Sequence, residues 1–347
     1  MRLLLLLLLV LPGACSRDDT TNASLHQSQL LALGTLVDIS LWDVDEKLAD
    51  QAIHDIDGRL HRIHEDWHSW LPGRLHDINT ALANGQDVEL TDDEMELLQH
   101  ASRLAAQSDQ LFNPAIGHLI GLWGFHSDSP EGPPPPDSAI QKQLQLKPRM
   151  SDLVFSGHTL RSNNKAVQLD VGAFAKGYAI DQAIALLRQR GINNAIVNAG
   201  GDLRAIGRHG QRPWRIGIRH PTAAGVIASV EVQGDESVFT SGNYERFYEY
   251  QGQRYHHIID PRNGYPAKHS LSVTVIHQDA TTADAAATAL FIAGPERWST
   301  IARQMGIDQA MLIDEHLTVY MTPAMAQRVE LKQELKRIIE EPHESDD

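Results

Sequence analysis

Five stretches in the second half of the chain carry the apolar patterns of β-strands, and few helical patterns separate them. A doubly wound parallel sheet requires a helix between successive strands, whereas antiparallel strands can follow one another directly. The sequence therefore predicts an α+β fold of mixed, mainly antiparallel sheets with packed helices. The five predicted strand regions are residues 195–203, 214–220, 226–232, 246–250 and 271–277.

Amphipathic spacing and capping signals locate the helices. Apolar residues recur every three or four positions from Ala49 to Trp67, which predicts one face of a helix. Thr91 followed by Glu94 is a capping-box pattern that begins a second helix. Further helices are predicted at residues 177–190, 282–292 and 296–304, and a strand hairpin is predicted near residue 314.

The N-terminus carries a secretory pattern, with an unbroken apolar stretch from Leu3 to Leu11 followed by small residues and Cys15. Residues 1–14 are predicted to be a signal peptide. Its end, LPGAC, resembles the lipobox of bacterial lipoproteins, in which the cysteine is lipidated. Residues 15–29 are predicted to be a lipid-attached tether before a folded domain that begins near Leu30. An ordinary signal peptide with an incidental cysteine is the alternative.

The charge balance and the cysteine count exclude several classes of function. The chain has 45 acidic and 30 basic residues and no long basic run, which argues against a nucleic-acid-binding protein. Because Cys15 is the only cysteine, no intramolecular disulfide, cysteine-zinc site or thiol nucleophile is available. Residues 323–347 are charged, and Leu331, Leu335 and Ile338 form one helical stripe. We expect a C-terminal helix there, packed or solvated, and then an acidic tail.

The stretch DVGAFAKGYAID, residues 170–181, places one lysine among small residues at the start of a predicted helix. Gly172 and Gly177 allow a ligand to approach the backbone closely, and amides at a helix N-terminus favour an anion. Lys176 would add a positive point charge beside a phosphate. The alternative is a surface lysine in the first turn of the helix.

Two other stretches carry candidate ligand groups. Asp284 and Thr288 lie four residues apart and face the same side of a predicted helix. Sparse oxygen ligands that leave room for phosphate and water suit Mg²⁺, although a helix-dipole partner and a packing residue are the alternative roles. Strong turn formers after Ile259 end a predicted strand at residues 256–259, so His257 and His256 face opposite sides. One of these histidines could line a cleft while its neighbour is solvated.

Together these stretches resemble one family, the ApbE flavin transferases, also called FAD:protein FMN transferases. The resemblance covers nearly all of the predicted domain, residues 30–322, and it implies an ApbE-like fold. The lipobox also fits the family. The matching stretches are LGT at 33–35, LFNPAIGHLIGLWGF at 111–125, LDVGAFAKGYAID at 169–181, NAGGDLRAIG at 198–207, TSGNYER at 240–246, HIIDPRNGYP at 257–266 and ADAAATALF at 283–291.

The resemblance also implies roles for individual positions. Magnesium is expected at the backbone carbonyl of Ala173 and at the side chains of Asp284 and Thr288. The family usually has Asp where Asn113 stands and Pro where His118 stands, which implies altered recognition of adenosine. Trp70 occupies the approximate place of an aromatic residue that contacts the flavin. The other residues expected to bind FAD are Leu33, Leu111, Phe112, Asn113, Asp170, Lys176, His257 and Ile258.

The chemistry implied by the resemblance is Mg-dependent transfer of FMN from FAD to a threonine hydroxyl of an acceptor redox-protein subunit, with release of AMP. Lys176 and Asp284 are the catalytic candidates that act on the phosphates, and His257 is the candidate that accepts the threonine proton or else binds phosphate. Two alternatives stay open: an Mg-dependent FAD pyrophosphatase that yields AMP and FMN, and a tethered FAD-binding protein without enzyme activity. The expected location is the periplasmic side of a bacterial membrane, anchored through Cys15.

Overall fold

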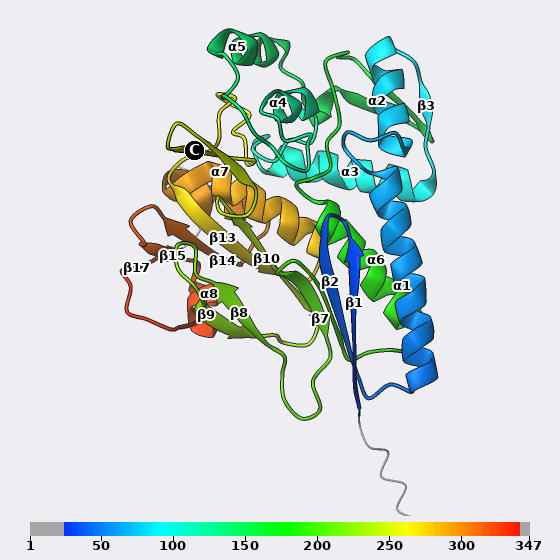
Figure 1. The fold of residues 1–347 in the computed structure, drawn as a ribbon, viewed down its shortest axis with the longest axis vertical. Coiled ribbons are helices and arrows are strands. Elements are labelled where there is room, and N and C mark those ends of the chain that lie inside the picture. The colour runs from blue at the N-terminus through cyan, green and yellow to red at the C-terminus, as the bar shows by residue number, and fades with distance from the viewer. Residues whose placement is uncertain (1–23, 341–347) are drawn as a thin grey trace, which may run out of the picture.

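A nine-stranded sheet runs through the centre of the molecule (Figure 1). The computed structural model describes residues 24–340. The strand order is β1-β2-β6-β7-β10-β13-β14-β15-β17, and every neighbouring pair is antiparallel except β15 and β17. The predicted α+β fold with mainly antiparallel sheets is therefore confirmed. In that order the strands span Leu25–Ala32, Thr35–Trp42, Ala195–Ala199, Asp202–Ile206, Glu236–Gly242, Ser270–His277, Gln309–Asp314, Val319–Met321 and Arg337–Ile339.

Three long helices, α1 (Glu46–Asp66), α6 (Ala175–Gln189) and α7 (Ala280–Gln304), pack beside one another and against this sheet (Figure 1). Their apolar faces and the facing strand residues form the main hydrophobic core. The helical periodicity predicted before residue 67 is confirmed by α1. Both helices predicted between residues 282 and 304 belong to α7, which is interrupted at Gly294, where φ is 68° and Pro295 follows.

Four further helices gather at one end of the molecule (Figure 1). The capping box at the start of one of them is confirmed, since the Glu94 N–H donates to Thr91 Oγ1 at 3.3 Å and the Thr91 N–H donates to Glu94 Oε2 at 2.9 Å. The helices are α2 (Arg74–Asn84), α3 (Asp92–Gln107), α4 (Gly117–Leu122) and α5 (Asp137–Leu146), and a small sheet of β3 (Val88–Glu89), β5 (Thr159–Ser162) and β4 (Leu153–Ser156) completes this end.

A second hydrophobic core lies between the central sheet and a three-stranded sheet of β16, β9 and β8. Because strands such as β7 are buried along their whole length, both faces of the central sheet exclude water there. The outer strands are β8 (Arg215–Arg219), β9 (Val226–Glu231) and β16 (Glu330–Leu331), while β11 (Phe247–Tyr250) and β12 (Gln253–His256) form a separate hairpin.

The predicted start of the folded part is wrong by several residues. Strand β1 begins at Leu25 and pairs with β2 from Leu25 opposite Trp42 to Ala32 opposite Thr35. The polar side chains that suggested a tether as far as residue 29 are tolerated because β1 is an edge strand with one face toward solvent. The signal peptide and Cys15 lie outside the described residues.

The predicted C-terminal helix is also wrong. Helix α8 covers Pro323–Arg328, after which the chain forms β16 and then β17, and residues 341–347 lie outside the described part. Leu331 pairs opposite Ala228 in β9, and Leu331 and Leu335 pack against the second core. Strand pairing and burial together outweigh the weak helical stripe. Among residues 24–340, no helix is both long enough and apolar enough to cross a membrane.

Helices α6 and α7 approach each other most closely at Gly177. A Cβ atom at this position would overlap the Ala280 carbonyl oxygen and lie 2.7 Å from Thr281 Cα. Both obstacles are backbone atoms at the start of α7, so they cannot rotate away as a flexible side chain can. The position of α7 relative to α6 therefore depends on glycine at residue 177.

Gly177→Ala is expected to lower the free energy of unfolding by about 1–3 kcal/mol, because the two helices must move apart to admit the methyl group. Gly58→Ala in the middle of α1 is the matched control, since its Cβ would meet only the end of the Arg62 side chain at 3.9 Å. That control is expected to be stabilising by up to about 1 kcal/mol. Urea unfolding measures the free energy of unfolding of both variants. Equal changes of the same sign would contradict the conclusion that the contact between α6 and α7 requires glycine at residue 177.

Candidate active site

The candidate site lies where α6 begins, beside the turns at one end of the central sheet. Lys176 is the second residue of α6, and its ammonium group forms an ion pair with the carboxylate of Asp202, the first residue of β7. The Asp202 side chain is 4% exposed, and its other oxygen accepts a hydrogen bond from the Thr240 N–H at 2.8 Å. Lys176 is thus held by a buried partner and is not a free surface lysine.

Asp284 projects from α7 toward the same lysine. Its Oδ2 atom accepts a hydrogen bond from the Gly177 N–H at 2.9 Å, and within residues 24–340 no further hydrogen bond reaches this carboxylate. Burial, opposed by the Lys176 charge and reinforced by the charge of Asp202, raises the pKa of Asp284 to about 8. An additional cation would remove this cost, because it would favour the ionised carboxylate.

More acidic than basic groups lie around Lys176, which favours binding of an additional cation. Burial acts to lower the pKa of Lys176, but the negative charges of Asp202, Asp284 and Glu245 outweigh burial and raise it. Three acidic groups therefore surround one ammonium group. The described residues contain no group of three or more His, Cys, Asp or Glu side chains in metal-binding geometry.

The expected magnesium ligands are compatible with this arrangement. Thr288 follows Asp284 by one helical turn, and its Oγ1 lies 3.2 Å from Ser241 Oγ. Ala173 is partly buried and lies two residues before the start of α6, so its backbone carbonyl belongs to the same segment as Lys176. One carboxylate, one hydroxyl and one carbonyl oxygen are hard donors of the kind that Mg²⁺ binds together with phosphate oxygens and water.

The amides at the start of α6 are arranged differently from the sequence prediction. The Ala175 N–H donates to the Val171 carbonyl at 2.8 Å, and the Gly177 N–H donates to Asp284. The anion at this helix N-terminus is therefore a carboxylate of the protein. Lys176 is left as the positive group that a phosphate could approach, since 27% of its side chain is exposed.

Asp170 anchors an aromatic and cationic cluster beside the start of α6. Burial alone would raise the pKa of Asp170, but hydrogen bonds from His126 at 2.9 Å, the Gly172 N–H at 2.8 Å and the Ser69 hydroxyl at 3.0 Å lower it. Trp70 stacks on His126 with 5.5 Å between ring centroids. The predicted FAD-binding residues Asp170 and Trp70 are thus brought together through His126.

His257 lies in the same region, held by the β11–β12 hairpin. Its Nδ1 is 3.1 Å from the Arg246 carbonyl oxygen, and since a carbonyl only accepts, the Nδ1 atom carries the proton and Nε2 has the free lone pair. Burial, with the nearby charges of His256, Arg246 and Lys176, lowers the pKa of His257 to about 3. The ring is therefore neutral at neutral pH.

The predicted strand over residues 256–259 is shorter than expected, because β12 ends at His256. The expectation that one of the two histidines is solvated is wrong. His256 is buried and donates from Nε2 to the Ala267 carbonyl at 2.9 Å, and His257 is partly buried. Ile258 is 5% exposed, so its side chain belongs to the core, while its carbonyl accepts from the Ala267 N–H at 2.9 Å.

Leu111 and Phe112 are 1% and 0% exposed as whole residues, so in this structure neither offers side-chain or backbone surface to a ligand. Asn113 is partly buried and lines a cavity of about 580 Å³ that also reaches Arg149 and Arg262. Its Nδ2 donates to the Pro148 carbonyl at 3.0 Å, and its Oδ1 accepts from the Ala115 N–H at 3.1 Å. His118, the other departure from the family pattern, is exposed on the rim of the same cavity.

Leu33 occupies the turn between β1 and β2 with a left-handed φ of 54°. The neighbouring Thr35 contacts the Gly200 turn, where a Cβ would lie 2.6 Å from Thr35 Oγ1. Because Gly200 precedes Asp202 by two residues, Leu33 belongs to the same end of the sheet as Lys176. The structure thus gathers Leu33, Lys176 and Asp284 around neighbouring turns, while the Asn113 cavity extends between α4 and α5.

Several site residues were not identified from the sequence. Asp202 and Glu245 lie within the stretches NAGGDLRAIG and TSGNYER, but nothing local shows that their charges face Lys176. His126 and Arg246 were also missed. The Arg246 guanidinium lies 5.2 Å from the Trp70 ring centroid and donates to the Phe125 carbonyl at 2.8 Å.

Comparisons with known proteins identify the family of this chain. Residues 33–312 match the model of the ApbE family. An FAD:protein FMN transferase of Rhodobacter capsulatus is 43% identical over 322 residues, which cover 93% of this chain but 61% of the relative. Another, from Klebsiella pneumoniae, is 33% identical over 299 residues, 84% of this chain and 89% of the relative. This chain therefore spans less than two thirds of the Rhodobacter relative's length.

Solved structures show the same fold. The crystal structure of the ApbE protein from Thermotoga maritima has a TM-score of 0.79 at 30% identity, over 90% of this chain and 100% of that chain. The apo form of the Pseudomonas stutzeri flavinyl transferase ApbE has a TM-score of 0.76 at 28% identity, over 88% of this chain and 96% of that chain.

The raised pKa of Asp284 makes the stability of the metal-free protein depend on pH. Its carboxyl ionises near pH 3.8 when unfolded and near pH 8 when folded, so the folded state holds the extra proton and the free energy of unfolding falls as pH rises through this interval. Asp284→Asn stays neutral and can still accept from Gly177. We expect it to be more stable than wild type at pH 8 by at least about 1.4 kcal/mol, the equivalent of one pKa unit.

Denaturant unfolding in EDTA at pH 4, 6 and 8 measures this difference, which should shrink toward zero at pH 4. If the difference in the free energy of unfolding between Asp284→Asn and wild type stays constant across the three pH values, ionisation of Asp284 does not destabilise the folded protein.

Proposed function

Because the chain belongs to the ApbE family, we propose that it transfers FMN from FAD to a threonine hydroxyl of an acceptor protein and releases AMP. The observation that carries this proposal is the cluster of Lys176, Asp202 and Asp284, in which a partly exposed lysine is held by a buried aspartate and lies near an under-partnered carboxylate. Such a cluster suits a divalent cation together with a diphosphate, because the cation needs a negative group such as Asp284 and the diphosphate needs a positive group such as Lys176. It contains no thiol or serine nucleophile, and phosphoryl transfer to a bound hydroxyl requires none.

Asp284, Thr288 and the Ala173 carbonyl are the residues that would hold Mg²⁺, which when bound supplies charge neutralisation to the diphosphate. Lys176 is fixed by Asp202 and contributes a positive charge on the same side. Its raised pKa keeps it protonated throughout the physiological range. These groups stabilise negative charge that develops on the phosphate oxygens during transfer.

His257 is the proposed acceptor of the threonine proton. In the step, the threonine oxygen forms a bond to the FMN phosphorus, the bond from that phosphorus to the bridging oxygen breaks, and AMP leaves with that oxygen. The proton moves to Nε2 of His257, the nitrogen with the free lone pair. The low pKa of His257 leaves Nε2 unprotonated but makes the ring a weak base, so in this proposal the negative charge of the bound diphosphate raises that pKa and allows the proton to transfer.

The flavin end of FAD is proposed to lie against Trp70, Asp170 and the His257–Ile258 segment. Trp70 offers a planar ring beside His126 and Arg246. The Asn113 cavity, bordered by arginines, is proposed for the adenosine end. Leu33, in the turn between β1 and β2, is proposed to contact FAD as well.

The location is proposed from the sequence of the leader. The apolar stretch and the LPGAC pattern support export and lipidation at Cys15. A lipid anchor there would hold the domain on the periplasmic side of a bacterial membrane, beside membrane-bound redox subunits with a suitable threonine.

Cys15→Ser should then move the protein from the membrane to the soluble periplasmic fraction without changing its binding of FAD. Wild-type protein found already in the soluble fraction would refute the anchor.

The transferase proposal is tested by incubating the protein with FAD, Mg²⁺ and redox-subunit fragments that contain candidate threonines. We expect one fragment to gain a fluorescent adduct of FMN mass that survives denaturing gels, with one AMP released per adduct. Thr288→Val, which loses the hydroxyl at nearly constant volume, should need at least about tenfold more Mg²⁺ for the same rate. Thr288→Ser keeps the hydroxyl and is the matched control.

AMP released without any adduct would instead indicate the pyrophosphatase. Intact FAD that binds equally well to wild type and Asp284→Ala, with no AMP, would indicate the binding protein. Equal Mg²⁺ dependence of the Val and Ser variants would remove Thr288 from the metal site.

Asn113→Asp tests how the FAD site accommodates its departure from the family's usual residue. Aspartate cannot donate to the Pro148 carbonyl, so two oxygens would face each other where the hydrogen bond now lies. We expect a loss of stability of about 1–3 kcal/mol and no gain in FAD affinity, measured by unfolding and calorimetry. The exposed substitution Asn163→Asp is the control. Tighter FAD binding by Asn113→Asp would show that the turn rearranges to present the carboxylate to FAD.

A further inference from the structure

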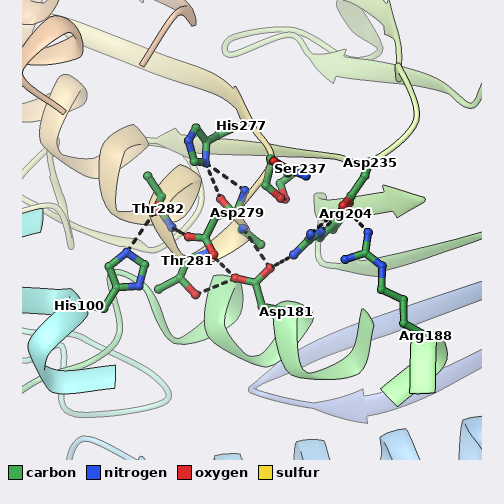
Figure 2. A network of polar contacts seen from close by, with 12 residues as sticks. His100, Asp181, Arg188, Arg204, Asp235, Ser237, His277, Asp279, Thr281 and Thr282 are labelled. Carbon is green, nitrogen blue, oxygen red and sulfur yellow. Dashed lines mark hydrogen bonds and ion pairs between the residues drawn. The ribbon is translucent and has the colours of Figure 1, made fainter. Parts of the chain in front are cut away.

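A second polar network joins α6 to α7, and Figure 2 shows it at close range. Its centre is Asp181, five residues after Lys176 on α6. The Asp181 carboxylate accepts hydrogen bonds from the Ala280 N–H at 3.0 Å, the Thr281 N–H at 2.9 Å and the Thr281 hydroxyl at 2.8 Å. Ala280 and Thr281 form the first turn of α7, so Asp181 binds the N-terminus of the neighbouring helix.

This contact is the counterpart of the one made by Asp284. Asp284 of α7 accepts from Gly177 in the first turn of α6, while Asp181 of α6 accepts from the first turn of α7. Each helix therefore supplies a carboxylate to the other's N-terminus, where negative charge is favourable. One contact is made at Gly177 itself and the other by Asp181, four residues later on α6, and together they fix how far each helix extends past the other.

Two ion pairs of opposite polarity also join α6 to β7. Lys176 pairs with Asp202, and Asp181 pairs with Arg204. Asp202 and Arg204 are two residues apart on the strand and therefore face the same side. If α6 shifted along β7, Lys176 would move toward Arg204 or Asp181 toward Asp202, and like charges would meet. The alternating charges thus specify one register of α6 on β7.

Arg204 is itself held in a fixed orientation. It is 8% exposed and donates to both oxygens of Asp235, at 2.9 Å from Nε and 3.0 Å from Nη2. Arg188 forms a further ion pair with Asp235, as Figure 2 shows. Because Arg204 is bound on both sides, it presents a rigid positive group to Asp181.

Asp181 is retained despite an electrostatic cost. Burial and the nearby charge of Asp279, opposed by Arg204, raise the pKa of Asp181 to about 6. Asp279 is the N-cap of α7 and accepts from the Thr282 N–H at 2.7 Å. Two carboxylates therefore converge on one helix start, although Asp279 alone would cap it. The second one adds the link to α6.

We propose that Asp181, oriented by Arg204, is a positioning residue that sets Lys176 and Asp284 in register for catalysis. It lies five residues after Lys176 on α6, and it acts through the placement of α6 and α7. This inference rests on the proposed transferase activity, in which Lys176 and Asp284 act on the same diphosphate.

Steady-state FMN transfer by Asp181→Asn tests the proposal, at saturating Mg²⁺ and well below the unfolding temperature. The variant nearly preserves volume but weakens the ion pair and one of the two amide contacts. We expect kcat to fall by about 10- to 100-fold, the effect of a small misplacement of catalytic groups, while KM for FAD changes by less than about threefold. Thr281→Val, which removes only the donating hydroxyl, is the milder second variant and should lower kcat in the same direction.

Arg190→Gln is the matched control, because it breaks an ion pair between α6 and Asp55 of α1 without touching α7 or β7. It should lower the unfolding temperature but leave kcat unchanged. Equal kcat for Asp181→Asn and Arg190→Gln would overturn the proposal. In the Asp284→Asn background, adding Asp181→Asn should lower the residual activity by a smaller factor than in wild type, because only the placement of Lys176 remains to be disturbed, whereas the full multiplicative loss would show that Asp181 does not act through Asp284.

A measurement without activity separates this inference from the proposed function. A double-mutant cycle of Asp181→Asn and Asp284→Asn in urea unfolding should be non-additive, because both carboxylates fix the same pair of helix starts. Additive effects would overturn the inference. If wild type transfers no FMN but the cycle is non-additive, the proposed transferase fails while the coupling between the two helix starts stands.

Discussion

The close contact between the first turns of α6 and α7 is the constraint on which the candidate site depends. Gly177 lets the two backbones meet, and its N–H donates to Asp284 from the other helix. Lys176 precedes Gly177 and reaches Asp202 on the central sheet. Three parts of the fold that are far apart in sequence thereby place their charged groups around one point.

The energetics of this point favour a bound cation. Burying a carboxylate is costly unless it is paired, and Lys176 must satisfy Asp202 as well as Asp284. The free protein therefore carries a destabilised Asp284, whose ordinary ionised form is restored by additional positive charge. In the proposed function, such a site would use part of the stability of the fold to create affinity for the ion, and the bound ion would help to orient a diphosphate.

The elements that the sequence predicted well are those with local signals. The periodicity before residue 67, the Thr91–Glu94 capping box and the strand patterns after residue 195 each depend on neighbours within a few positions. Lys176, Asp284 and Thr288 were identified through motifs of the same local kind. Their convergence is consistent with the predicted site, whereas their individual roles are proposals.

The features that sequence reasoning missed depend on partners distant in the chain. Strand β1 looked like a tether because its pairing with β2 supplies what its polar side chains do not. The C-terminal stripe looked helical because Leu331 and Leu335 are spaced four apart, yet their burial partners lie in the second core. Asp202 gave no sign of facing Lys176, since 26 residues separate the two in sequence. Pairings of this kind follow from topology and not from local pattern.

The most direct test of the central claim is a crystal structure of the protein with FAD and Mn²⁺, because anomalous scattering locates the ion independently of the flavin. The account predicts one anomalous peak bound to Asp284 and Thr288 oxygens, at about the 2.0–2.2 Å typical of such small divalent ions, with the diphosphate between it and Lys176. Flavin bound in the site with the ion elsewhere, or with Asp284 still contacting only Gly177, would contradict it.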